Sequence, residues 1–469
     1  MEHNENHRTL CSMYEDFRDT ALEKRLETYA LWTIPSVFPE NCSERHHQNG
    51  NSEIRHDYQS TGSRLVNTLA SKLTSTLFPY STAFFRIQAT EQIKQVIAQN
   101  GAQGNVAKNV TEIENVANKA LFANAAYAQL TQLVKLLIIT GNALLVRRDK
   151  KCTVYSLKNY AIKRNGSGEV EHIIIKEHIH HNDLSPDIKK TARIPDKGEY
   201  EQEHHEVYTH VHHTETMING RAIPSWHVTQ EINGMDIGTD ETYTEYDCPY
   251  IPVVWTLMNG DSYGRGYVEE YTGDFARLSE LSQKYTEYEL EALRVIHVYD
   301  PSKPFDLYEL QNSKIGDFVQ GDHSAISAYE VGVYQKLQQV AADLSAVIQG
   351  LEIAFMSQSN TRDAERVTAY EIQMNAAEAD KLLGGVYSQL SLSLHLPLAY
   401  LLLAEIMPKL VEAIIQGQFD IQLIVGLQAL ASSSENQALL LATQQIATVA
   451  QVFNSLNQIA PRYNLDAIS

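Results

Sequence analysis

The chain has 469 residues and a formal net charge of −20, because 58 acidic side chains outnumber 38 basic ones. These values exclude a peptide, a collagen-like fibre and an ordinary basic nucleic-acid-binding domain. Hydrophobic residues make up 43% of the chain, close to the globular average, so we expect a few domains with buried cores. We expect neither a secretory signal nor a membrane span, and four scattered cysteines favour a reducing cytoplasm.

The N-terminal third is predicted to be mainly helical, because its apolar residues recur at steps of three and four. The predicted helices cover residues 14–31, 65–77 and about 106–137, and Pro35 and Pro79 follow the first two. The apolar face of the third helix is expected to contain Leu121, Ala125, Leu130, Leu133 and Leu137.

From about residue 142 the apolar period changes to two, which predicts β-strands. Asn-Gly pairs at residues 165–166, 219–220 and 233–234 favour tight turns with positive φ, so we expect antiparallel hairpins up to about residue 257. The clearest predicted strands cover residues 143–147, 153–157, 170–176 and 206–213.

Two long helices with apolar seams are predicted on either side of a small insert. The first seam runs from Tyr271 to Ala292 and the second from Val333 to Phe355, both at steps of three and four. Prolines and glycines interrupt the insert between them, in which residues 296–299 and 317–319 are predicted strands.

Beyond the second long helix, the polar residues 357–365 predict a loop. Thr368 and Glu371 then form a capping-box pattern for a helix that reaches Leu394 and is kinked near Gly384. From about residue 419 the composition predicts a further amphipathic helical module.

Histidines are concentrated in the β-rich part, where 10 of the 18 lie between His172 and His227. Residues 205–210 read HExxxH, one residue longer than the zinc-binding helix motif, and they alternate like a strand. Alternation places His205 on one face and His210 and His212 on the other. We therefore expect surface histidines on β-hairpins and no metal site.

No sequence motif supports an enzyme. Gly264 and Gly266 begin a dinucleotide-type pattern, but Glu269 stands where its third glycine would be, so these glycines are expected to serve a sharp backbone turn. The chain contains neither a phosphate-binding GxxxxGK[ST] loop nor a GxSxG nucleophile motif. We expect no catalytic residue, no cofactor and no bound metal.

Three groups of motifs carry a resemblance to a known family. The first comprises TIPSVFP at residues 33–39, DYQ at 57–59, NTLASKL at 67–73 and LFP at 77–79; the second comprises CPYIP at 248–252 and SYGRGYVEEY at 262–271; the third comprises ERVTA at 365–369, LGGVYS at 383–388 and LPL at 396–398. In order and spacing they resemble the head-to-tail connecting (portal) proteins of short-tailed, podovirus-type bacteriophages. The histidine-rich hairpins are not part of this resemblance.

The resemblance implies an α+β, mainly helical portal fold with long stem helices, a β-rich wing and a small β-containing clip. The implied parts are a wing at residues 1–265, stem helix 1 at 266–294, a clip at 295–332, stem helix 2 at 333–355, a tunnel loop at 356–366, a long kinked wing helix at 367–416 and a helical crown at 417–469.

The resemblance also implies a non-enzymatic ring of twelve copies at one capsid vertex of the virion, made in the host cytoplasm. Double-stranded DNA would pass through its channel without sequence specificity, during packaging and ejection. The implied protein partners are the terminase large subunit, tail adaptor proteins, and capsid and scaffolding proteins; no membrane is involved. Twelve copies at −20 carry about −240 in total, which suits a channel through which phosphates must slide.

The candidate site residues fall into three groups. The tunnel loop would contact DNA, one face of stem helix 1 would line the channel, and the clip would bind the motor and tail proteins. These groups are, in that order, Gln358, Asn360, Arg362, Asp363 and Arg366; Glu280, Glu287 and Glu291; and Lys303, Asp306, Tyr308, Glu309 and Lys314. The alternative hypothesis is a His-dependent metallohydrolase built on the β-rich part, which tightly held stoichiometric zinc would favour.

Overall fold

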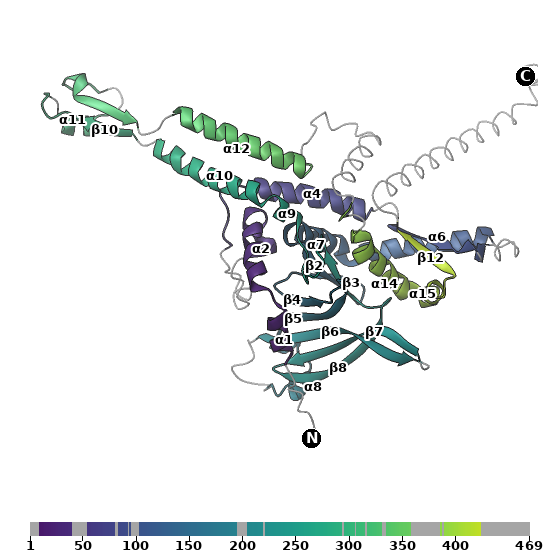
Figure 1. Ribbon diagram of the computed structural model, residues 1–469. Helices are drawn as coiled ribbons and strands as arrows, with labels where there is room; N and C mark the ends of the chain where they lie inside the picture. The colour runs from purple at the N-terminus through teal and green to yellow at the C-terminus, as the bar shows by residue number, and fades with distance from the viewer. Residues whose placement is uncertain are drawn as a thin grey trace, which may run out of the picture.

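A computed structural model contains both helices and sheets, with more residues in helices than in strands, which confirms the expected α+β class. Figure 1 shows a body of helices and sheets from which two long helices, α10 (Thr272–Ala292) and α12 (Tyr334–Ala354), extend side by side to a small tip. The structure describes residues 9–39, 54–79, 83–91, 93–94, 103–194, 204–218, 221–292, 295–304, 306–314, 317–330, 334–357, 385–386 and 389–423.

The first predicted helix is two helices, α1 (Leu10–Phe17) and α2 (Thr20–Trp32), so the prediction of one helix over residues 14–31 was wrong. The break lies at Asp19, whose carboxylate accepts hydrogen bonds from the backbone N–H groups of Ala21 and Leu22. A side chain that caps a new helix start competes with continuation of the preceding helix.

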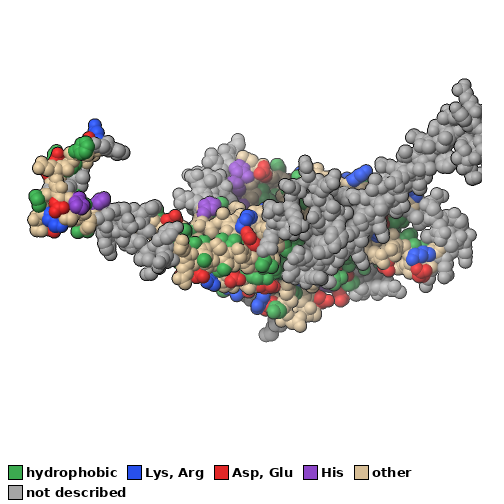
Figure 2. Space-filling view, turned by 90° about the horizontal axis from the view of Figure 1, so that it is seen from above, with side chains coloured by type: hydrophobic (Ala, Val, Ile, Leu, Met, Phe, Trp, Pro, Cys, Tyr) green, Lys and Arg blue, Asp and Glu red, His purple; other side chains and the backbone are tan. Residues whose placement is uncertain are grey.

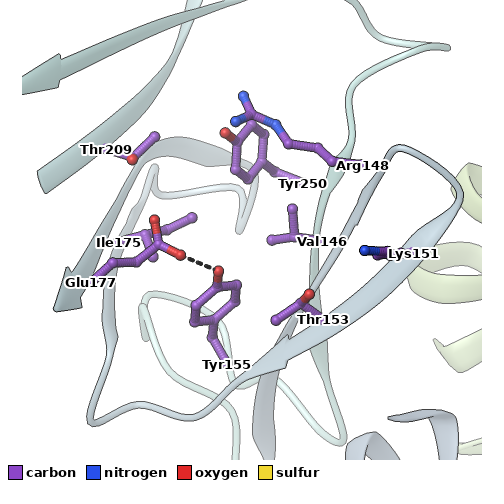
Figure 3. Close-up of a pocket in the computed structure, with 9 residues that line it drawn as sticks. All are labelled: Val146, Arg148, Lys151, Thr153, Tyr155, Ile175, Glu177, Thr209 and Tyr250. Carbon is purple, nitrogen blue, oxygen red and sulfur yellow. Dashed lines mark hydrogen bonds between the residues drawn. The ribbon is translucent and has the colours of Figure 1, made fainter. Parts of the chain in front are cut away.

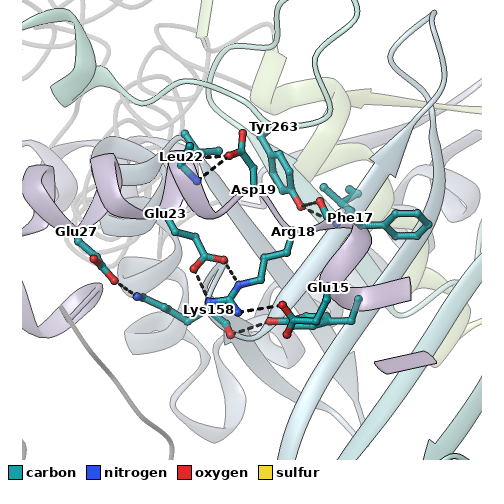
Figure 4. Close-up of polar contacts among 12 residues, drawn as sticks. Glu15, Phe17, Arg18, Asp19, Leu22, Glu23, Glu27, Lys158 and Tyr263 are labelled. Atoms are coloured by element: carbon teal, nitrogen blue, oxygen red, sulfur yellow. Dashed lines mark hydrogen bonds and ion pairs between the residues drawn. The ribbon is translucent and has the colours of Figure 1, made fainter. Parts of the chain in front are cut away.

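Polar contacts join these two helices to segments far away in the sequence (Figure 4). Arg18, between α1 and α2, donates from Nη2 to Glu23 Oε2 at 2.6 Å. The Tyr14 hydroxyl donates to the Lys158 carbonyl at 3.0 Å, and the Tyr263 hydroxyl donates to the Phe17 carbonyl at 2.8 Å. The N-terminal helices are thereby fixed to the β-rich part of the body.

The second and third predicted helices are also present, with one correction. The second is α4 (Thr61–Leu77), which buries its leucine stripe. The short 3-10 turn η1 (Pro35–Val37) precedes it in the chain. The third is interrupted: α6 (Gln103–Phe122) and α7 (Ala126–Thr140) meet at the turn η2 (Ala123–Ala125). Ala125 has positive φ there and is exposed, so its predicted place on the apolar face was wrong.

One helical stretch, Lys108–Thr140, is long and apolar enough to cross a membrane by length and composition alone. Its second part, α7, lies in the main core with Leu130, Leu133 and Leu137 fully buried. Burial inside the fold accounts for its apolar composition, because a core helix is hydrophobic on most of its faces.

Two antiparallel sheets form the β-rich part, as predicted. The strands are β2 (Asn142–Arg148), β3 (Lys151–Tyr155), β4 (Tyr160–Arg164), β5 (Val170–His180), β6 (His204–Ile218), β7 (Arg221–Ile232), β8 (Met235–Thr244) and β9 (Tyr250–Val254). The orders are β3-β2-β9 and β4-β5-β6-β7-β8. Between β5 and β6 lie the turn η3 (His181–Asp183) and the short helix α8 (Pro186–Thr191). Asn233 and Gly234 both have positive φ between β7 and β8, as expected for a tight Asn-Gly hairpin turn.

The insert at the tip contains a two-stranded sheet of β10 (Val295–Tyr299) and β11 (Ile326–Glu330), with the short helix α11 (Leu307–Asn312) and the turn η5 (His323–Ala325) between them. The predicted strand at residues 317–319 is irregular backbone instead. The Asp317 carboxylate accepts a hydrogen bond from the Lys314 N–H, which closes a local turn. Phe318 is 100% exposed there, so no apolar partner favours an extended pairing.

The C-terminal described part contains the π-helical turn η6 (Ser391–His395), α14 (Leu396–Ile406), α15 (Pro408–Ile415) and the strand β12 (Phe419–Leu423). β12 pairs with β1 (Phe85–Ala89), so the helix predicted from residue 419 is a strand over its described part. Phe419, Ile421 and Leu423 alternate with polar residues, a period of two that the overall composition concealed. Most of the helix predicted over residues 368–394 lies outside the described residues.

A close crossing of backbone joins the core to the long helices. A Cβ on Gly266 would lie 2.8 Å from Gly141 N, and one on Gly264 would lie 2.9 Å from Gly141 O, so any side chain there would clash. The buried Asn142 side chain donates to the Gly264 carbonyl and accepts from the Gly264 N–H, each at 2.7 Å. This amide satisfies both backbone groups of Gly264 where no strand could.

Replacing Asn142 by Ala should leave the buried N–H and C=O of Gly264 without partners. We expect the free energy of unfolding to fall by about 2–6 kcal/mol, from about 1–3 kcal/mol for each of the two buried unsatisfied groups. Denaturant unfolding measures the change. The control is Asn182→Ala at an exposed position, expected to stay within about 0.5 kcal/mol. Equal effects of the two substitutions would contradict the role of the Asn142 amide.

Candidate functional site

The pair α10 and α12, with the short helix α9 (Tyr267–Glu270) at its base, forms the extended part of the molecule. The sequence predicted both helices and their seams, and α10 packs on α12. Burial is complete only near the body: Phe275, Leu278, Leu351 and Phe355 are at most 1% exposed. Further out, Tyr285 is only partly buried and Leu290 is 67% exposed.

An aromatic cluster holds the two helices together at their base. The Phe355 ring lies 5.1 Å from Tyr267, 5.6 Å from Tyr271 and 5.6 Å from Phe275, measured between ring centroids. The Tyr267 hydroxyl also donates to the Ala354 carbonyl at 3.0 Å. Burial raises the pKa of the Tyr267 hydroxyl well above its usual value, so this group stays a protonated donor.

Two basic residues of α4 tie the end of α12 to the body. Arg64 Nη2 lies 2.6 Å from Glu352 Oε1, and Lys72 Nζ donates to the Met356 carbonyl at 2.6 Å. A cation at the C-terminal end of a helix is favourable because the unpaired carbonyls there carry partial negative charge. Sequence reasoning missed these contacts, because 288 and 284 positions separate the partners.

The three acids predicted to share one face of the first long helix, Glu280, Glu287 and Glu291, are all exposed on α10. Lys284 Nζ lies 2.9 Å from Glu287 Oε2, so these two side chains form an ion pair on this face. Hydrogen bonds from Lys284 and Gln283 lower the pKa of the Glu287 carboxyl. Glu287 therefore stays ionised at neutral pH, and all three acidic side chains are open to whatever lies beside the helix.

The five residues predicted on the tip surface lie around α11 and its flanking loops. Asp306, Tyr308, Glu309 and Lys314 are exposed, and the Tyr308 side chain is 78% exposed. Lys303 is half-buried and donates from Nζ to Ser324 Oγ at 2.7 Å, which ties two loops of the tip together. Figure 2 shows acidic, basic and hydrophobic side chains intermixed at this end of the molecule, on the left.

The tunnel-loop residues lie outside the described part of the structure. This applies to the whole predicted set, namely Gln358, Asn360, Arg362, Asp363 and Arg366. The last described residue before them, Ser357, follows α12 directly, and its N–H donates to the Glu352 carbonyl at 2.8 Å. The chain therefore enters this loop from the base of the long helices.

The histidines of the β-rich part are less exposed than expected. His210 and His212 share one face of β6, as predicted, with their ring centroids 4.7 Å apart. His205 on the other face and His210 are each 8% exposed, so the prediction of surface histidines was wrong for both. Helix α1 packs on the face that contains His210, and on the opposite face His181 Nδ1 lies 3.2 Å from His205 Nε2. Among the described residues, no three His, Cys, Asp or Glu side chains are grouped so as to hold a metal ion.

A polar cavity of about 120 Å³ lies where the two sheets meet (Figure 3). The Tyr155 hydroxyl donates to Glu177 on one side, and Arg148 lies over the Tyr250 ring at 5.1 Å on the other. Burial raises the pKa of Tyr155, so the phenol remains a donor. The lining residues are Val146, Arg148, Lys151, Thr153, Tyr155, Ile175, Glu177, Thr209 and Tyr250, which include no histidine or cysteine.

Comparison with known proteins assigns the family. The family model described as bacteriophage head to tail connecting protein matches residues 8–469, almost the whole chain. The chain belongs to this family. It is therefore a head-to-tail connecting (portal) protein of the podovirus type, which places it at the portal vertex of the virion, as the sequence motifs predicted.

Individual relatives agree with the family assignment. The portal protein of Pseudomonas phage phiKMV is 37% identical over 465 residues, covering 97% of this chain and 88% of the relative. The portal protein of Escherichia phage T7 is 31% identical over 406 residues, covering 84% and 74%. The portal protein of Enterobacteria phage T3 is 30% identical, covering 82% and 71%.

The second group of family motifs contributes to the glycine crossing and to the aromatic cluster at the base of the long helices. CPYIP precedes and forms most of β9, and SYGRGYVEEY contains Gly264, Gly266 and the two tyrosines of the aromatic cluster. Asn142, which binds Gly264, was missed by sequence reasoning. Its only local sequence signal is its position directly after Gly141, a glycine at the end of a predicted helix. In the structure Gly141 ends α7 with a positive φ.

Replacing Phe355 by Ala should loosen the base of the two long helices of the connecting protein. Truncating a fully buried phenylalanine costs about 3–5 kcal/mol of unfolding free energy. The matched control is Phe318→Ala, the same change at a fully exposed position, expected within about 0.5 kcal/mol. Urea unfolding of both variants provides the comparison. If Phe355→Ala lowers the free energy of unfolding no more than Phe318→Ala does, the aromatic cluster does not hold the two helices together.

Proposed function

We propose that twelve copies of this connecting protein form a closed ring whose central channel carries double-stranded DNA into and out of the capsid, and that the protein itself has no enzymatic activity. The proposal rests chiefly on the apolar seam of α10 and α12, which is fully buried at its base and only partly buried toward the tip. A second copy is the natural cover, since a repeated contact between different faces closes into a ring when its rotation permits.

The parts of the ring follow the element order. We assign the wing to residues 1–265 and 367–416, the stem to 266–294 and 333–355, the clip to 295–332, the tunnel loop to 356–366 and the crown to 417–469. The extended helix pair with a small sheet at its tip supports the assignment of stem and clip (Figure 1).

The channel wall is assigned to the acidic face of α10 and to the tunnel loop. Glu280, Glu287 and Glu291 would repel phosphates, so DNA would slide without the counterion release that holds it on basic surfaces. In the tunnel loop, Gln358, Asn360, Arg362, Asp363 and Arg366 would contact the DNA backbone.

The clip is assigned as the docking surface for the terminase large subunit during packaging and for tail adaptor proteins afterwards. Tyr308 and the charged side chains around it support this, because exposed aromatic residues among charged groups are common in protein interfaces. Capsid and scaffolding proteins would contact the wing. A separate motor protein would supply the ATP hydrolysis.

Native mass measurement of the purified protein should give a closed ring of about twelve subunits. In a closed ring every subunit has a neighbour on each side, which can cover the partly buried apolar residues of its long helices. A ring one subunit larger or smaller outside the capsid would still agree with the proposal. A stable monomer at micromolar concentration would exclude it.

The substitution Glu287→Lys tests whether the proposed channel wall needs its negative charge. The change adds +2 per subunit, about +24 in a ring of twelve, and it also deprives Lys284 of its partner. If five phosphates gained a cation, the logarithm of DNA affinity would fall with the logarithm of salt at a slope of about −4.5. We expect packaging to slow at low salt and recover as salt rises, because ions screen the added charge.

The matched control is Glu412→Lys, the same reversal at an exposed position on α15. It should leave packaging unchanged at every salt concentration. A salt series that gives the same packaging rate for Glu287→Lys and wild type, with ring assembly verified, would remove Glu287 from the channel wall.

A further inference from the structure

Four histidines, which we call the histidine cluster, lie on one face of the five-stranded sheet: His172, His210, His212 and His227. In the strand register His172 is opposite His212, and His212 is opposite His227, so three neighbouring strands each contribute. His210 precedes His212 by two residues and points to the same face. The shared face packs against α1.

The rings of the histidine cluster touch one another directly. His172 Nδ1 lies 3.1 Å from His210 Nε2, which is a hydrogen bond between two neutral rings, one donating and one accepting. His210 stacks on His212 at 4.7 Å, and His212 meets His227 at 5.0 Å, both between centroids. If both rings of the first pair were protonated, each would present only donors and the hydrogen bond would be lost.

Helix α1 closes over the cluster. The Phe17 ring stacks on His172 with 5.7 Å between centroids, and the Leu10 N–H donates to Glu231 Oε2 at 2.9 Å on the same face. Buried Nδ1 atoms of His212 and His227 have no hydrogen-bond partner in the described structure. A neutral ring tolerates one unpaired nitrogen, whereas a charged ring needs acceptors for both of its donors.

Charged groups around the cluster have opposing effects on the protonation of its histidines. Lys163 on β4 is opposite His172 in the register and lies over the Phe17 ring at 5.5 Å, so it opposes positive charge on His172. Glu171 on β5 favours that charge. Asp240 on β8 lies 2.5 Å from His227 Nε2 and holds that ring at the edge of the cluster. On α1, Asp16 is the acidic residue next to Phe17, and Glu231 on β7 binds the helix start.

We propose that the histidine cluster is an acid-sensitive latch, which holds α1 on the five-stranded sheet while the rings of His172, His210 and His212 are neutral and releases α1 when they are protonated. Release would free the hydrogen-bonded and stacked rings to be hydrated as separate cations. It would also expose the face of the sheet on which α1 lies. This goes beyond the channel function and uses a part of the wing distant from the stem in sequence.

The direction of the pH effect follows from the closed structure. Burial, then the neighbouring histidines, lower the pKa of His210 to about 3 from the usual 6.5, and burial also lowers the pKa of His172 and His212. A lowered folded-state pKa means that the latch is fully stable above about pH 6.5 and weakens as the pH falls toward the folded value. For His210 alone, the open population should rise about thirtyfold between about pH 7.5 and about pH 5.

Hydrogen–deuterium exchange of the full-length protein tests the latch. Amides of α1 should lose about thirtyfold or more of their protection between about pH 7.5 and about pH 5, after correction for intrinsic exchange rates. Amides of α4, in the core away from the cluster, should lose far less. The pH dependence should be the same with excess EDTA, since an effect that disappears with the chelator would make the cluster a metal site and overturn the proposal.

Two variants isolate the cluster. His210→Gln and His172→Gln remove a titrating ring and keep a side chain that hydrogen-bonds, so each should flatten the pH dependence of α1 exchange. The control is His213→Gln on the opposite face of β6, where the ring packs on Trp226; it should keep the wild-type dependence. Wild-type dependence in both test variants, or α1 protection that does not change with pH in the wild type, would refute the latch. The wild-type measurement decides even if neither variant folds.

Discussion

The direction of the long helices depends on one backbone crossing, at Gly141, Gly264 and Gly266. No side chain fits there, and the Asn142 amide supplies the hydrogen bonds that the crossing segments cannot make with each other. Helix α9 begins at the residue after Gly266, so the crossing fixes the angle at which α10 leaves the body. With 21 residues, α10 is about 31 Å long at ~1.5 Å per residue, and a tilt of about 10° at its base would move the tip by about 5 Å. Any function of the tip that requires a fixed position therefore depends on this crossing.

Local patterns in the sequence predicted most of the elements that carry the candidate site. The seams of α10 and α12 repeat every three or four residues, and Asn233-Gly234 has the backbone geometry that its sequence indicates. Such signals survive because each depends on neighbours within one or two turns of chain. The exposed acidic face of α10 was predictable for the same reason, since helical spacing alone separates Glu280, Glu287 and Glu291 from Phe275 and Leu278.

Long-range pairings and local competition account for what the sequence did not predict. Arg147 makes a two-pronged contact with Glu405 across 258 positions, at 2.8 and 2.9 Å, and no local pattern marks either residue. The break at Asp19 and the kink at Asn124 and Ala125 needed the geometry of particular caps and positive φ angles. The histidines were expected at the surface because strand alternation gives the face of a residue but not what covers that face. Helix α1, far away in sequence, covers the face that contains His210.

The distribution of burial along α10 and α12 also supports the proposal that neighbouring copies complete the single chain. Near the body, Phe275, Leu278, Leu351 and Phe355 are at most 1% exposed, so the two helices already pack tightly there in the single chain. Toward the tip, Leu290 of α10 is 67% exposed, and Tyr285, which belongs to the apolar seam of α10, is only partly buried. Burying a leucine gains about 1.5–3 kcal/mol, and a ring would collect that gain at every subunit boundary. If the ring forms, the outer parts of α10 and α12 should become rigid only on assembly, so the position of each tip should depend on its neighbours. The base of these helices is set by the glycine crossing and should be the same in the free and the assembled chain.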